Sequence, residues 1–127
     1  MMKFHHIGIA CVDIDQMKQY MDRLYDVVNV SDKIYDNLQE AELCMITLHD
    51  GTQVELVHGK PVEKLVKKRQ FLYHICYSTN DIEGKIEEME NMGAKTISEP
   101  KAAMLFGGKK VAFLMSEMGL IELLEEE

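Results

Sequence analysis

The chain has 127 residues, close to the commonest length of a single domain and long enough to bury a core without disulfides. Its 22 acidic residues outnumber 14 lysines and arginines, and the formal net charge is −8. A nucleic-acid backbone would be repelled by this charge, so we expect no nucleic-acid partner.

The cysteines indicate a reducing compartment. Cys11, Cys44 and Cys76 are odd in number, widely spaced and embedded in apolar runs, which favours reduced core thiols over a disulfide framework. No apolar segment approaches the roughly 18 residues that a membrane-spanning helix needs, and the N-terminus lacks the apolar core of a signal peptide. We therefore expect a cytoplasmic protein that is neither exported nor embedded in a membrane.

The first half of the chain reads as β-α-β-β-β. Residues 4–12 are short, apolar and compatible with a strand, and Asp13 with Gln16 forms a capping-box pattern that begins a helix. The apolar stripe of this helix recurs at spacings of three, four and seven, at Ile14, Met17, Met21, Leu24, Tyr25 and Val28. Strands are then predicted over 30–35, weakly, and more clearly over 42–48 and 52–57, with a turn at 49–51.

The second half repeats this order. When His6 is aligned with His74, 68 residues later, Asp13 meets Asp81 and Ile14 meets Ile82. A helix is again predicted over 82–92, and Gly93 stops it. With the shift reduced by one residue, 54–56 meets 121–123 and the strand 44–48 meets 111–115.

We interpret residues 1–127 as one domain with module one at about 1–58, a short amphipathic linker helix at about 59–69, and module two at about 70–127. The stretch 100–110 is predicted to be an irregular, mobile loop. Whether the part around Gly107 and Gly108 acts as a lid is left open.

Two histidines and two glutamates occupy matching places in the repeat. His6 shares its strand face with Gly8 and Ala10, and small residues likewise follow His74, which leaves room beside each imidazole. Glu55 and Glu122 each interrupt an apolar strand, and a buried carboxylate needs a cation, a hydrogen-bond partner or a proton.

Taken singly, each of these residues is more often structural. A lone histidine on an apolar strand is usually hydrogen-bonded, and a lone glutamate in a strand usually faces solvent. Their joint recurrence in both halves instead predicts one metal site with the ligands His6, Glu55, His74 and Glu122. Mixed nitrogen and oxygen ligands suit nickel, zinc, cobalt or manganese, and the ligands alone do not choose among these ions.

On these residues the chain resembles the vicinal oxygen chelate superfamily, which includes glyoxalases, bleomycin resistance proteins and dioxygenases. The matching segments begin at His5, Gln53, Tyr73 and Val111 and together cover essentially the whole chain. The resemblance implies an α+β fold in which two repeated βαβββ modules form a curled mixed sheet around a metal cleft. It places His6, Glu55, His74 and Glu122 at the ligand positions and excludes His5, which points to the opposite strand face.

Within that superfamily the chain looks most like bacterial glyoxalase I (lactoylglutathione lyase) and methylmalonyl-CoA epimerase. The resemblance implies proton abstraction next to a metal-bound carbonyl, with Glu122 as the catalytic base and Glu55 opposite it. Epimerases tend to carry an extra glutamate beside a Gln-Gly pair, and residues 36–40 offer no clear equivalent. The glycine before the last glutamate is also displaced, to Gly119. We therefore favour a glyoxalase I-type lyase or isomerase, with the epimerase as the alternative.

A basic cluster in this acidic chain bears on the substrate. It consists of Lys60, Lys64, Lys67, Lys68, Arg69, Lys109 and Lys110. It favours either a solvated helix face or a small anionic thiol conjugate, such as a glutathione adduct or an acyl-CoA.

We expect a homodimer, and whether the cleft forms within one chain or across the dimer stays open. A non-catalytic, antibiotic-sequestering module would need no metal ligands. An extradiol dioxygenase would need only two histidines and one glutamate around iron.

Overall fold

The computed structural model describes all residues from 1 to 127, which form nine strands and three α-helices. They divide into two compact units, each described by itself below. The first unit comprises His6–Tyr73, and the second comprises Met1–His5 with His74–Glu127. The predicted α+β class is confirmed. No helix is long and apolar enough to cross a membrane.

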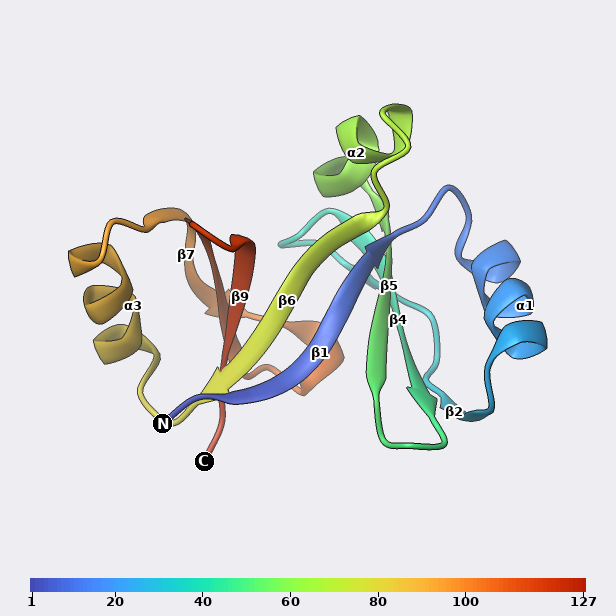
Figure 1. Ribbon diagram of the computed structural model, residues 1–127, viewed down its shortest axis with the longest axis horizontal. Coiled ribbons are helices and arrows are strands. Elements are labelled where there is room, and N and C mark those ends of the chain that lie inside the picture. Colours follow the sequence, from blue (N-terminus) through green and yellow to red (C-terminus); the bar gives the residue numbers. More distant parts are fainter. The chain divides into compact units, whose positions relative to one another are not determined.

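The first unit contains strands β1 (Lys3–Ala10, from His6 onward), β2 (Val27–Val30), β3 (Ile34–Asp36), β4 (Ala41–Leu48) and β5 (Gln53–Gly59). Its strand order is β2-β4-β5-β1, and β3 also pairs with β4 (Figure 1). The first and last strands, β1 and β5, are parallel, and the other pairs are antiparallel. Helix α1 (Ile14–Leu24) connects β1 to β2.

The second unit has the same plan. Strands β6 (Leu72–Thr79), β7 (Lys95–Ala102), β8 (Lys110–Ser116) and β9 (Gly119–Glu125) follow the order β6-β9-β8-β7, and helix α3 (Ile82–Asn91) connects β6 to β7. Here β6 and β9 are the parallel pair. The predicted β-α-β-β-β order therefore occurs in full in this unit.

Helices α1 and α3 begin as the sequence predicts. The side chain of Asp13 accepts a hydrogen bond from the Gln16 N–H at 2.9 Å, and Asp81 accepts one from the Gly84 N–H at 3.0 Å. These N-cap bonds satisfy donors that the first helical turn leaves without intrahelical partners.

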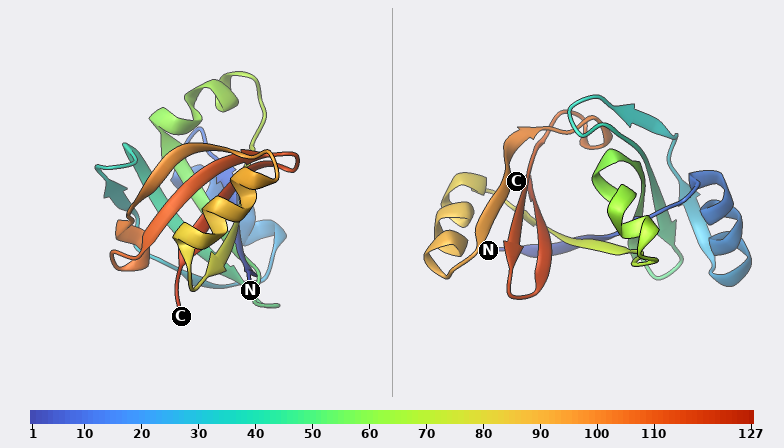
Figure 2. Two further views of the ribbon diagram at one scale, coloured as in Figure 1. Left: turned by 90° about the vertical axis from the view of Figure 1, so that its left-hand side faces the viewer. Right: turned by 90° about the horizontal axis from the view of Figure 1, so that it is seen from above.

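Each helix then covers one face of its own strands, as Figure 2 shows. The resulting cores are apolar and equivalent in the two units. The first consists of Cys11, Ile14, Met21, Cys44, Ile46, Val54 and Leu56, and the second of Ile82, Ile86, Ala112, Leu114, Ile121 and Leu123.

The three cysteines are free and buried, as expected of core thiols. Burial raises the pKa of the Cys11 thiol to about 11, although a hydrogen bond with the Val57 backbone opposes this shift.

The predicted ends of α1 and of the following strand were wrong. The helix stops at Leu24, because Tyr25 takes an extended conformation, and Val28 lies exposed on β2 instead of continuing the helical stripe. The strand predicted over 30–35 is split into β2 and β3. Ser31 interrupts it, because its hydroxyl accepts the Met45 N–H at 2.8 Å in place of a strand carbonyl.

Two loop predictions also need adjustment. Residues 100–102 lie in β7, not in a loop, and the register of β7 against β8 shifts between Ser98 and Lys101. Pro100 lies within that irregularity, where a missing N–H is tolerated. The predicted linker helix is shorter than expected, with a 3-10 turn at Lys60–Val62 and helix α2 at Glu63–Lys67.

Gly59, at the end of β5, takes a backbone conformation that requires glycine, and a substitution tests this requirement. Its φ of 137° and ψ of −161° are accessible essentially only to glycine, and an added Cβ would lie 2.7 Å from the Glu40 carbonyl oxygen. We expect Gly59→Ala to lower the free energy of unfolding by at least about 2 kcal/mol in urea titrations. Gly51→Ala is the control. Gly51 has φ of 90° but open space around it, so we expect a loss of about 1 kcal/mol. Equal losses would contradict the role of the Glu40 contact.

Candidate metal-ligand pairs

The first unit buries a histidine against a glutamate. His6 projects from β1 and Glu55 from β5, and their exposed fractions are 0% and 2%. His6 Nε2 lies 3.3 Å from Glu55 Oε1. The parallel register explains the contact, because Gly8 pairs with Glu55 and His6 lies two residues earlier on the same strand face.

The second unit repeats this arrangement. His74 on β6 and Glu122 on β9 are 2% and 1% exposed, and His74 Nε2 lies 3.1 Å from Glu122 Oε1. Cys76 pairs with Glu122, so His74 again precedes the paired residue by two. Both His–Glu pairs therefore follow from one strand register used twice.

The spacing within each pair fits two ligands of one metal ion. With metal–ligand bonds of about 2.1 Å meeting at a right angle, two ligand atoms lie about 3.0 Å apart. An imidazole nitrogen and a carboxylate oxygen also form a donor set suited to zinc, nickel or cobalt. All four side chains are buried potential metal ligands. The residues of each pair thus fit half of a four-ligand metal centre.

The neighbouring antiparallel strand adds one large apolar residue beside each pair. Met45 on β4 pairs with Glu55, and Phe113 on β8 pairs with Glu122. The rings of Phe113 and His74 meet edge to face, with centroids 5.3 Å apart and an interplanar angle of 75°. Phe113 therefore supports one side of the imidazole whose Nε2 faces Glu122.

Sequence reasoning missed Met45 and Phe113 because its alignment of the middle strands was wrong by one residue. It matched 44–48 with 111–115, which places Met45 opposite Ala112. The observed registers instead make Met45 equivalent to Phe113. The β8–β9 hairpin is one residue shorter than the β4–β5 hairpin, and a slip of one residue in a strand exchanges its two faces. The signal that could have found them is the difference in hairpin length. If the strand before each glutamate is aligned by counting back from that glutamate through its hairpin, Met45 and Phe113 become equivalent.

The displaced glycine lies in this shorter hairpin. Ser116 pairs with Gly119, which has φ of 94°, and the Ser116 hydroxyl accepts the Met118 N–H at 3.0 Å. Glu122 still pairs with Phe113, so the altered turn does not displace the glutamate from its register.

Asp36 is the buried acidic residue of the stretch 36–40, in which the sequence offered no clear equivalent of the extra epimerase glutamate. It is fully buried, and its Oδ1 accepts hydrogen bonds from the Leu38 N–H at 2.9 Å and the Gln39 N–H at 3.3 Å. Gln39 Nε2 donates to its other oxygen at 3.3 Å. The carboxylate thus holds the turn between β3 and β4.

His5 and Cys76 belong to the packing of the second unit. The His5 ring meets Phe106 edge to face at 5.5 Å, and its Nε2 lies 3.8 Å from Glu126 Oε1. Cys76 packs with Ala103, Val111 and Leu124, and Phe106 covers this cluster.

The segment from Ala103 to Lys109 is a closed turn. The Ala103 N–H donates to the Lys109 carbonyl and the Gly108 N–H donates to the Ala103 carbonyl, each at 2.9 Å.

Comparisons with known proteins identify the family of the chain. A family model described as "Glyoxalase/Bleomycin resistance protein/Dioxygenase superfamily" matches residues 5–113. A curated relative, the ethylmalonyl-CoA/methylmalonyl-CoA epimerase of Cereibacter sphaeroides, is 27% identical over 119 residues, covering 88% of this chain and 87% of the relative.

Two solved structures share the fold. Methylmalonyl-CoA epimerase from Mycobacterium tuberculosis has a TM-score of 0.82 at 16% identity, covering 98% of this chain and 87% of that chain. A Streptomyces coelicolor methylmalonyl-CoA epimerase variant in complex with 2-nitronate-propionyl-CoA has a TM-score of 0.74 at 21% identity. The match covers 98% of this chain and 94% of that chain.

The contact between Phe113 and His74 can be tested through metal affinity. Second-layer contacts that orient a ligating histidine are commonly worth at least tenfold in affinity. We expect Phe113→Leu to raise the Kd for zinc about tenfold, measured by competition with a chromophoric chelator, and Phe113→Tyr to retain most of the affinity because it keeps the ring. Leu114→Val is the control, because Leu114 packs in the helix-facing core and should affect stability alone. Unchanged zinc affinity in Phe113→Leu would contradict the orienting role.

Proposed function

Because the chain belongs to the Glyoxalase/Bleomycin resistance protein/Dioxygenase superfamily, we propose that it is a metal-dependent epimerase of a 2-carboxyacyl-CoA thioester. In this proposal His6, Glu55, His74 and Glu122 together hold one divalent metal ion. The observation that carries it is the pair of buried His–Glu contacts, which are spaced as metal ligands and repeated at equivalent strand positions.

The relatives support the epimerase over the glyoxalase I-type reaction that the sequence favoured. The curated relative that spans most of the chain is an ethylmalonyl-CoA/methylmalonyl-CoA epimerase. The two structures compared are also epimerases, and one of them holds a CoA thioester analogue. None of these three is a lactoylglutathione lyase. The acyl-CoA is therefore the better supported of the two substrate classes expected from the sequence.

One observation keeps the glyoxalase I-type reaction as a second candidate. Asp36 holds its own turn through three hydrogen bonds and Glu40 contacts Lys60, so neither acidic residue of the stretch 36–40 replaces the additional epimerase glutamate. Proton transfer then depends on the carboxylates of the two His–Glu pairs, and such a site also suits a glyoxalase-type proton transfer between neighbouring carbons.

In the proposed mechanism the imidazoles and the carboxylates have different roles. A bound divalent ion would polarise the thioester carbonyl and acidify the adjacent C–H. His6 and His74 are held in place by the contacts of their Nε2 atoms with Glu55 and Glu122. Burial of these side chains keeps water away from the reacting carbon. Each glutamate would loosen from the ion to act: Glu122, ionised, removes the proton from that carbon, and Glu55, protonated while it is off the ion, returns a proton to it. The two carboxyl groups exchange protonation states in each turnover, which prepares the site for the opposite enantiomer.

The first test measures metal content and proton exchange together. We expect protein purified with added divalent metal to contain one ion per chain by elemental analysis. It should exchange the C2 hydrogen of methylmalonyl-CoA for deuterium in heavy water. Glu122→Gln should retain most of the metal and lose at least about a hundredfold in exchange rate, because general acid-base groups contribute on that scale. Glu117→Gln is the control, since Glu117 is an exposed residue of the same hairpin.

Full exchange activity in Glu122→Gln would contradict its role as base, and the absence of stoichiometric metal would contradict the metal centre. Turnover of methylglyoxal with a thiol, without exchange on methylmalonyl-CoA or ethylmalonyl-CoA, would favour the second candidate. The homodimer, the cytoplasmic location and the division into modules at residues 58 and 70 stay predictions.

A further inference from the structure

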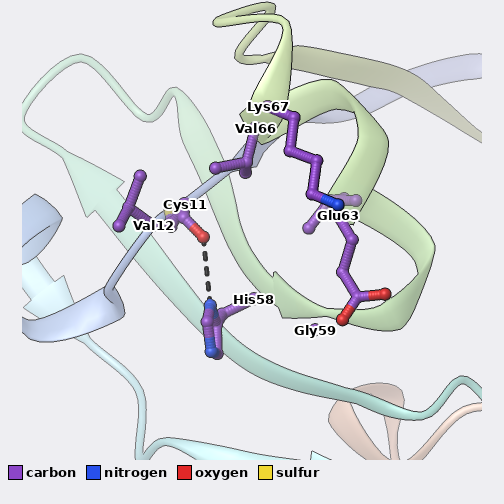
Figure 3. A pocket seen from close by; sticks show the side chains of 8 residues that line it. Cys11, Val12, His58, Gly59, Glu63, Val66 and Lys67 are labelled. Carbon is purple, nitrogen blue, oxygen red and sulfur yellow. Dashed lines mark hydrogen bonds between the residues drawn. The ribbon is translucent and has the colours of Figure 1, made fainter.

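The first unit has a cavity of about 390 Å³ where β1 and β5 end (Figure 3). Its floor is apolar and largely buried, and its rim carries an imidazole, a carboxylate and an ammonium group. The floor consists of Cys11, Val62 and Val66, and the rim of His58, Glu63 and Lys67. A concave apolar site with a few polar groups at its edge is the usual form of a small-molecule pocket.

The His58 ring is held by a hydrogen bond from one of its nitrogens to the Cys11 backbone. Its Nδ1 lies 3.1 Å from the Cys11 carbonyl oxygen, the contact drawn in Figure 3. A carbonyl oxygen only accepts, so Nδ1 carries the hydrogen and, in the neutral ring, Nε2 carries a lone pair. The exposed imidazole thus offers an acceptor for an amino group and a flat ring for stacking on a base.

The chain next to the cavity is strongly basic. Between residues 60 and 69 there are five cationic side chains and one acidic one, in a protein of net charge −8. Lys60 already contacts Glu40 at 3.1 Å, whereas Lys64, Lys67, Lys68 and Arg69 are exposed on α2 and just after it. A concentration of positive charge in an acidic protein attracts phosphate groups to that place.

The distance from the His6–Glu55 pair to the cavity matches the length of a CoA arm. Cys11 is five residues beyond His6 along β1, or about 16 Å at the rise of a strand, and Gly59 is about 13 Å beyond Glu55. The pantetheine arm has about thirteen bonds between its sulfur and the nearest phosphorus, roughly 16 Å when extended. Because β1 and β5 are parallel, both strands run from the His–Glu pair to the ends where the cavity lies. Cys11 and His58 face the helix side of the strands, so the arm would pass over the strand ends to reach the cavity.

We propose that this cavity and the basic segment 60–69 bind the nucleotide end of the CoA thioester. The adenine lies on the apolar floor, and its amino group donates to His58 Nε2. The phosphates lie on Lys64, Lys67, Lys68 and Arg69. This assignment rests on the proposed function for its substrate, but the nucleotide contacts involve only residues outside the His–Glu pairs.

Calorimetry with 3′,5′-ADP, the nucleotide end of CoA, tests the site without any turnover. We expect Lys64→Glu/Lys67→Glu to raise the Kd for 3′,5′-ADP at least tenfold at about 0.15 M salt, and to raise KM for methylmalonyl-CoA with kcat unchanged. The matched control is Lys3→Glu/Lys95→Glu, which makes the same charge change at exposed lysines of the second unit and should leave Kd unaltered. His58→Phe keeps a ring but removes the acceptor. It should weaken 3′,5′-ADP binding and leave inorganic pyrophosphate binding unchanged.

Equal Kd values in the Lys64/Lys67 and Lys3/Lys95 variants would overturn the assignment, because the attraction would then be a general charge effect. Failure of the wild-type protein to bind 3′,5′-ADP, together with epimerisation of methylmalonyl-CoA, would overturn this inference and leave the proposed function standing. Nucleotide binding without epimerisation would support the site and contradict the proposed function. The two failures are therefore distinguishable.

Discussion

A carboxylate removed from water must be compensated by a cation, a proton or several donors, and this constraint explains the central contacts of both units. Glu55 and Glu122 are almost completely buried, and each has an imidazole nitrogen within 3.3 Å. The parallel pairing of the first and last strand of each module places these groups on one face. Helices α1 and α3 pack on the other face, where the apolar cores of the units lie. Packing and chemistry are thus separated by the alternation of side chains along each strand.

The two N-caps and the strand faces of the four candidate ligands were predictable because each depends on a local pattern. Alternation along a strand identifies which face His6 and His74 share, and Asp13 and Asp81 cap their helices through residues three positions away. The equivalence of Met45 and Phe113 was not predicted because it depends on the pairing of two strands. That pairing is set by hairpin length, which a shift-based alignment does not measure.

The split between β2 and β3 was also not predictable from periodicity. It results from a side-chain hydroxyl, that of Ser31, taking a hydrogen bond that a strand carbonyl would otherwise accept. The two copies of the repeat differ in the side chains beside the His–Glu pairs. A flexible methionine lies beside one pair and a rigid phenyl ring beside the other. The backbone plan is therefore shared more strictly than the side chains that it presents.

The parallel pairing of β1 with β5 has a kinetic consequence. His6 and Glu55 are joined by almost the whole of a module, and closing a loop of that length costs about 3 kcal/mol in chain entropy. Neither half of the ligand set exists until its module has closed, and contacts of this sequence separation slow folding. An ion that binds only the closed modules would stabilise the closed state by mass action. The same strands that position the two His–Glu pairs would thereby make metal occupancy a means of holding the fold together.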